Sequence, residues 1–191
     1  MTVDFDNAGP TVMRPSSFAH VFLKTNKFKE MVAFYKKLLD AEARFESERI
    51  AFMCFDEEHH RIAIAAVPHT TDKVRTSAGL EHIAFGFNTV EDLLLAYRQR
   101  KAAGLLPMWC VNHGITLSIY YEDPDGNRLE TQVDAYDTVD AATDFMNSPE
   151  FKSNPIGVDF DPEDLIKRLQ SGESAASVMK RDEDGVRSIP P

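Results

Sequence analysis

The chain has 191 residues, of which 43% are hydrophobic, and a formal net charge of −10 at pH 7 with a pI near 5.0. This length and composition are typical of one globular domain with a sizeable core and argue against a disordered chain. The acidic balance, with no basic stripe to offset it, predicts no nucleic-acid partner, and no apolar run is long enough to predict a membrane partner.

The N-terminal stretch and the two cysteines indicate the compartment. Residues 1–17 carry early acids without a basic-then-apolar pattern, so we expect no signal peptide. Cys54 and Cys110 lie in apolar, strand-like stretches and are expected to be buried, reduced thiols. Reduced thiols favour a cytoplasmic location.

Two stretches of the chain resemble each other at an offset of 62 residues. Residues 18–23 read Phe-Ala-His-Val-Phe-Leu and residues 80–85 read Leu-Glu-His-Ile-Ala-Phe, each followed three positions later by an asparagine. Amphipathic helices with a 3.6-residue period are predicted over residues 27–39 and 90–103. In both copies a tyrosine follows the histidine by 15 positions, so we infer a duplicated unit.

Strand-like segments follow each helix. They cover residues 42–46, 50–55 and 61–67 in the first copy and residues 106–111, 116–122 and 128–133 in the second. The Asp-Pro-Asp-Gly sequence at 123–126 marks a turn before the last strand. Each half therefore reads β-α-β-β-β, and two such halves can line a shared concave sheet. The expected organisation is an extension at 1–15, one domain at 16–134 with modules 16–68 and 79–134, and a tail at 135–191.

The tail differs in character from the modules. Asp-Pro-Glu at 161–163 is typical of a helix start and leads into a helix predicted over 164–169, which Gly172 ends. Beyond Ser174 the chain is polar and finishes in Pro190-Pro191, so we expect this part to be mobile or to lie across a neighbouring molecule. No chemistry is assigned to the tail.

Two of the six histidines stand out because they occupy equivalent places in the repeat. His20 and His82 lie in otherwise apolar first strands, where burying an imidazole costs free energy unless its nitrogens are used, and a metal ion would use them. A third ligand is expected from Glu130 in the last strand, which taken alone would be an exposed strand carboxylate. Two imidazoles and one carboxylate on one face leave three octahedral positions free, as in non-haem Fe(II) oxygenases.

The segment at 111–130 carries the most specific pattern. It reads Val-Asn-His-Gly-Ile-Thr-Leu-Ser-Ile-Tyr-Tyr-Glu-Asp-Pro-Asp-Gly-Asn-Arg-Leu-Glu. This resembles the signature of the type I extradiol ring-cleavage dioxygenases of the vicinal-oxygen-chelate superfamily, especially the catechol 2,3-dioxygenase branch. Residues 59–68 look like the strand of biphenyl-diol dioxygenases that presents a catalytic histidine. The resemblance covers residues 16–134, about three-fifths of the chain.

The resemblance implies a fold and a reaction. The fold is α+β, with two βαβββ modules forming one half-open barrel and a C-terminal helical tail. The reaction is extradiol (meta) cleavage of a small aromatic diol by O₂, in a homo-oligomer. The resemblance places Fe(II), or Mn(II) in its stead, at His20, His82 and Glu130.

Three further side chains receive roles from the resemblance. His60 would be the acid–base residue, although alone it would be an ordinary turn histidine, and His113 and Tyr120 would contact substrate or intermediates. This chain departs from the family in having one barrel where many members have two. His113 and Tyr120 are also closer together than in relatives, and the segment 69–81 is longer, so the substrate is less defined than the chemistry.

The remaining candidates favour structural roles. His59 should lie on the face opposite His60 and point to solvent. Tyr121, Tyr35 and Tyr97 are expected to be packing residues, and His69 is left unassigned.

Two alternative functions stay open. A glyoxalase-like lyase or isomerase of the same superfamily usually also takes a carboxylate ligand from the last strand of the first half, where this chain has His60 and Arg61. A metal-free small-molecule-binding module of the drug-sequestering type has no need for His20, His82 and Glu130 together.

Overall fold

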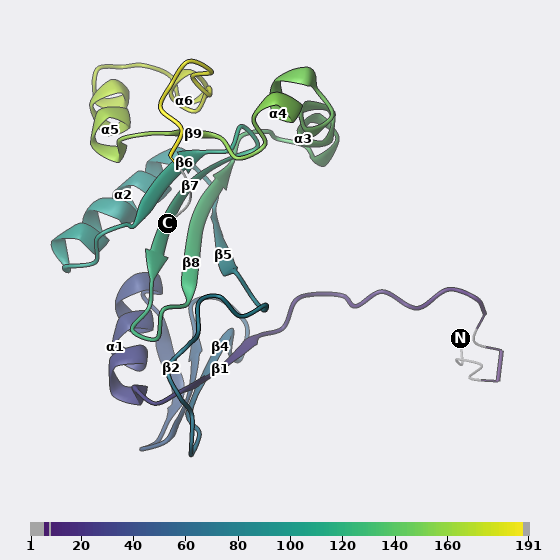
Figure 1. The fold of residues 1–191 in the computed structure, drawn as a ribbon, viewed down its shortest axis with the longest axis vertical. Coiled ribbons are helices and arrows are strands. Elements are labelled where there is room, and N and C mark those ends of the chain that lie inside the picture. The colour runs from purple at the N-terminus through teal and green to yellow at the C-terminus, as the bar shows by residue number, and fades with distance from the viewer. Residues whose placement is uncertain (1–5, 8, 189–191) are drawn as a thin grey trace.

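The computed structural model describes residues 6–7 and 9–188, and it contains two β-sheets with helices packed beside them (Figure 1). The first module consists of β1 (Val21–Thr25), α1 (Phe28–Leu39), β2 (Glu42–Glu46), β3 (Ile50–Cys54) and β4 (Ile62–Ala66). The second consists of β5 (His82–Phe87), α2 (Val90–Ala102), β6 (Trp109–Asn112), β7 (Thr116–Glu122) and β8 (Arg128–Asp134). The predicted β-α-β-β-β order of each half, and the α+β class, are confirmed.

The two modules also share a sheet topology. The first sheet has the strand order β1-β4-β3-β2 and the second has β5-β8-β7-β6, extended at its edge by the short β9 (Val158–Asp159). In each sheet the first strand of the module pairs in parallel with the last, and the other pairs among the module strands are antiparallel. The duplication read from the sequence is therefore a duplication of topology.

Both long helices bury the stripe that their sequences predict. Tyr35 in α1 and Leu93 in α2 are fully buried, and Tyr97 is nearly so, which confirms that the two repeat tyrosines are core residues. Thr89 caps α2 by accepting a hydrogen bond from the Asp92 backbone N–H at 3.1 Å. These helices cover one face of each sheet and leave the other face without a helix of its own module.

Strand register shows which side chains share the helix-free faces. Residues directly opposite each other on paired strands point to the same face. One such row crosses the first sheet and contains Phe22, Ala63, Phe52 and Phe45. The matching row crosses the second sheet and contains Ala84, Glu130, Tyr120 and Trp109.

The cysteines are free, as expected, with Cys54 buried and Cys110 only partly so. Burial raises the pKa of Cys110 to about 12, so its thiol stays protonated near neutral pH. Among the described residues, no helix combines the length and apolar character needed to cross a membrane.

The tail folds onto the second module. This includes the part beyond Ser174, which corrects the expectation that this part is mobile or lies on a neighbour. It forms α3 (Val139–Met146), α4 (Pro149–Ser153), β9, α5 (Pro162–Gln170) and α6 (Ala175–Val178). Asp161 caps α5 as predicted, although that helix begins two residues earlier than expected. Beyond Ser174, Val178 joins the hydrophobic core and Arg181 is buried. Two buried side chains fix this polar stretch, and Pro190-Pro191 lie outside the described residues.

Candidate metal and substrate site

His82 and Glu130 meet on the helix-free face of the second sheet. His82 is the first residue of β5, and Glu130 lies in the adjacent parallel strand β8, opposite Ala84. His82 is two positions from Ala84 and so shares its face, and its Nε2 lies 2.9 Å from Glu130 Oε2. The strand pairing thus brings together two of the three predicted metal ligands.

Glu130 is buried, with only 4% of its surface exposed, so the alternative of an exposed strand carboxylate is wrong. Ionised carboxylates are stable in a protein interior only beside donors or cations. Among the described residues, two imidazole nitrogens lie near its oxygens: His82 Nε2 at 2.9 Å from Oε2 and His113 Nε2 at 4.0 Å from Oε1. A buried carboxylate flanked by imidazoles is a donor set that suits a divalent metal ion.

His113 and Tyr120 stand beside this pair. The Nε2 atom of His113 lies 3.0 Å from the Tyr120 hydroxyl, and its Nδ1 bonds to the Ile156 backbone carbonyl. Because a carbonyl only accepts, Nδ1 carries a proton, and Nε2 of the neutral ring accepts from Tyr120. Burial lowers the pKa of His113, and burial together with the nearby Glu130 raises the pKa of Tyr120. Both shifts favour the neutral forms of these groups.

A pocket of about 290 Å³ opens over these side chains. It is lined by Glu81, His82, Met108, Trp109, His113, Tyr120, Arg128, Pro155 and Ile156. The Trp109 indole stacks on the Tyr120 ring, with 5.1 Å between centroids and 29° between planes. Sequence reasoning missed Trp109, although its position opposite Tyr120 in a hairpin could have shown it. It also missed Pro155 and Ile156, because the tail carries no recognisable motif.

His20 and His60 form a second, separate group on the first module. Their ring centroids are 4.5 Å apart, and His60 also lies 5.0 Å from the ring of Phe52. Burial, and then the neighbouring His59 and His20, lower the pKa of His60. The His59 side chain is 74% exposed, which confirms that it points to solvent. Its ring centroid lies only 4.4 Å from that of His60, so the expectation that the two side chains lie on opposite faces is wrong, because both residues lie in the turn before β4 and not in a strand. The first module therefore presents an imidazole pair on its helix-free side.

Within one chain the predicted triad is incomplete. The described residues contain no group of three or more His, Cys, Asp or Glu side chains that could hold a metal ion. The assumption that both repeat histidines are buried is wrong, because His20 precedes β1 and is exposed and the side chain of His82 is 37% exposed. Both residues sit at the start of a strand, where the sheet does not enclose them.

The family model described as Glyoxalase/Bleomycin resistance protein/Dioxygenase superfamily matches residues 17–131. This chain belongs to that superfamily. Its curated relatives include "Biphenyl-2,3-diol 1,2-dioxygenase 2" of Rhodococcus globerulus, which is 43% identical over 81% of this chain and 82% of the relative. "Biphenyl-2,3-diol 1,2-dioxygenase 3" of the same organism is 38% identical over 85% of this chain and 87% of the relative.

A solved structure has a similar fold. Lactoylglutathione lyase from Agrobacterium tumefaciens superposes with a TM-score of 0.52 and 15% identity, covering 63% of this chain and 96% of that protein. At this identity the likeness shows the fold alone. The superfamily model ends at residue 131, so the tail lies beyond it.

Proposed function

We propose that this superfamily member is an extradiol dioxygenase, which opens the ring of a catechol-type diol with O₂ at a mononuclear Fe(II) centre, or with Mn(II) in its place. The observation that carries the proposal is the buried Glu130 carboxylate, 2.9 Å from His82, which lines an aromatic-walled pocket. The names of the two Rhodococcus relatives supply the substrate class and the type of reaction.

The residues of the pocket suit this chemistry. His82 and Glu130 would hold the metal, which when bound activates the diol and O₂ together. The stacked Trp109 and Tyr120 rings offer an apolar wall to an aromatic ring. With the diol bound, His113 Nε2 can accept a hydrogen bond from a diol hydroxyl and the Tyr120 hydroxyl can donate to developing negative charge, while the transfer of the diol proton is assigned to His60.

Strand register weighs against a glyoxalase-like alternative with four protein ligands. Phe22 and Ala84 are equivalent in the repeat, and their strand partners are Ala63 and Glu130 respectively. The position equivalent to Glu130 in the first module is therefore Ala63, and not His60 or Arg61. Because a methyl group cannot ligate a metal, the second carboxylate ligand is missing.

The test of the proposed function uses protein purified without oxygen and loaded with Fe(II). We expect catechol, alkylcatechols or 2,3-dihydroxybiphenyl to yield a yellow ring-opened product, with one O₂ consumed per diol. Metal analysis of the same sample separates the alternatives. Protein that binds neither Fe(II) nor Mn(II) and consumes no O₂ would instead be the metal-free binding module.

We propose that the third ligand, His20, comes from a second copy of the chain. The helix-free face of the first sheet carries His20 and His60 beside exposed Phe22 and Phe45, which are 53% and 51% exposed. Large exposed apolar side chains grouped on one face favour a protein interface. In a twofold dimer this face can cover the pocket that His82 lines in the other copy, and the reciprocal contact makes a second centre.

The segment before β1 supports the same arrangement. Residues 9–16 are exposed along their whole length and lead away from both modules (Figure 1). They include Val12 and Met13, which are 89% and 87% exposed. Apolar side chains held away from their own core are suited to packing on another molecule.

Subunit mixing tests the shared centre. Neither His20→Ala nor Glu130→Ala should form a complete centre alone. Subunits exchanged in equal amounts should recover roughly one quarter of the wild-type metal sites, because each mixed dimer has one centre with both lesions and one with none. If every centre lies within one chain, mixing recovers no sites.

A matched control uses the double variant, His20→Ala with Glu130→Ala, exchanged with wild-type chains. A shared centre predicts roughly one quarter of the full metal content, because every mixed dimer loses both sites. A centre within one chain predicts about one half. Bound metal is counted directly, so the result does not depend on finding a substrate.

A further inference from the structure

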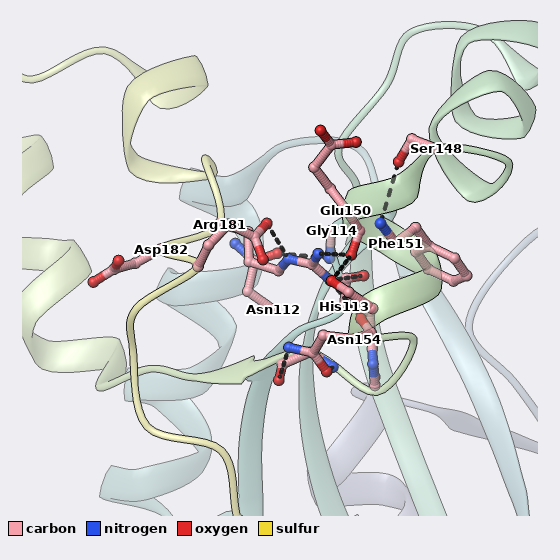
Figure 2. Close-up of polar contacts among 12 residues, drawn as sticks. Asn112, His113, Gly114, Ser148, Glu150, Phe151, Asn154, Arg181 and Asp182 are labelled. Atoms are coloured by element: carbon pink, nitrogen blue, oxygen red, sulfur yellow. Dashed lines mark hydrogen bonds and ion pairs between the residues drawn. The ribbon is translucent and has the colours of Figure 1, made fainter.

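One buried arginine of the tail, Arg181, contacts the backbone of His113, which lines the pocket. The Arg181 side chain is only 3% exposed and lies among the backbone carbonyls of three residues (Figure 2). One of its terminal nitrogens donates to the Asn154 carbonyl at 2.9 Å and to the His113 carbonyl at 3.2 Å. The other lies 3.4 Å from the Glu150 carbonyl, and Nε pairs with Glu183 at 2.8 Å. A planar guanidinium with five donors suits such a junction, and a lysine ammonium would not match it.

Asn154 begins a short loop, residues 154–157, that is closed by its own side chain. Its amide donates to the Gly157 carbonyl at 2.8 Å and accepts from the Gly157 N–H at 2.9 Å. Gly157 has φ of +121°, and a Cβ there would meet the Asn112 carbonyl at 2.4 Å. The loop is therefore pressed against the end of β6, with Arg181 bonded to its first residue.

This loop carries the carbonyl that holds His113. Ile156 accepts the hydrogen bond from His113 Nδ1, and Pro155 and Ile156 line the pocket. Arg181 thus bonds to the carbonyls of both His113 and Asn154. It ties together the strand end that carries His113 and the loop that carries Ile156, whose relative position decides whether His113 Nδ1 reaches the Ile156 carbonyl. The next residue, Gly114, packs under the same group, because a Cβ there would lie 3.2 Å from an Arg181 nitrogen.

We propose that Arg181 is a positioning residue for the pocket, acting through the 154–157 loop to fix the orientation and the tautomer of His113. Its role in turnover rests on the proposed function, since it assumes that His113 Nε2 faces the diol. The fixed tautomer itself does not rest on it. The tail, which lies beyond the matched superfamily region, therefore contributes to the geometry of the site.

The experiment compares Arg181→Met, which keeps the apolar volume without donors, with the wild type. Nitrogen-15 NMR of the histidine side chains should show His113 protonated at Nδ1 in the wild type. In the variant we expect a mixture of both tautomers, and a fall of roughly 100-fold in kcat for diol cleavage. The bound metal content should not change.

Two further variants keep the test decisive. Arg168→Met removes another arginine of the tail. Arg168 lies in α5 and pairs with Glu173, which follows that helix, so its loss should leave the His113 tautomer and kcat unchanged. Asn154→Ala opens the same loop with Arg181 in place, so it serves if Arg181→Met does not fold. A fully Nδ1-protonated His113 in folded Arg181→Met or Asn154→Ala would overturn the proposal, whatever the activity.

Discussion

Replacing Glu130 by glutamine is expected to abolish metal binding without unfolding the protein. Glutamine has the same shape, and its amide oxygen can still accept from the His82 ring, which lies 2.9 Å away. It lacks the charge that a divalent ion requires, so the affinity for Fe(II) should fall by at least about 100-fold. Anaerobic Fe(II) titration with metal analysis after desalting measures the loss.

The folded state of this variant is checked separately. The unfolding free energy of the metal-free protein in urea should change by no more than about 1 kcal/mol, because no cavity is made and no polar atom loses its partner. Glu122→Gln is the matched control, since it lies on a neighbouring strand and pairs with Arg75 outside the pocket. Full metal content in Glu130→Gln, or equal losses in both variants, would contradict the assignment of Glu130 as a ligand.

Replacing His60 by alanine should have the opposite signature, with iron kept and turnover lost. The His60 ring lies next to the His20 ring. In a centre that a second copy completes with His20, His60 would therefore lie beside the metal without ligating it. If it transfers the diol proton, its loss should lower kcat by about 100-fold to 10,000-fold. Steady-state O₂ uptake and metal analysis on the same preparation give both quantities.

An exposed histidine after β4 provides the control. His69→Asn removes an imidazole that is exposed to solvent, and asparagine tolerates the positive φ of this position, so iron content and kcat should both match the wild type. If His60→Ala turns over normally, the acid–base role belongs elsewhere in the pocket. If it loses iron as well, His60 is a ligand or is needed to hold His20.

The fold could be predicted from the sequence because both modules repeat the same local pattern of apolar strands, an amphipathic helix and polar turns. Glu42–Glu46 and Thr116–Glu122 are strands with the predicted bounds, since each is flanked by polar or glycine-containing turns. β6 starts at Trp109, three residues later than predicted. Leu106 extends the apolar run but is 67% exposed, and an apolar run alone does not show where strand pairing begins.

The candidate site could be predicted from the sequence only in part. The pairing of His82 with Glu130 follows from a specific signature and from adjacent parallel strands. The distance between His20 and this pair depends on how the modules are arranged, which no local pattern encodes. The role proposed for Arg181 could not be predicted from the sequence for another reason. Its partners are backbone carbonyls, such as those of Asn154 and His113, and any residue type supplies a carbonyl.

Extradiol cleavage at the Glu130 centre is tested most directly by a single turnover of the Fe(II)-loaded protein with one equivalent of 2,3-dihydroxybiphenyl under oxygen-18 gas. Mass spectrometry of the product then follows both oxygen atoms. We expect one yellow, ring-opened product that contains both labelled atoms, and no product from Glu130→Gln. A product with an intact ring, or full turnover by Glu130→Gln, would contradict it.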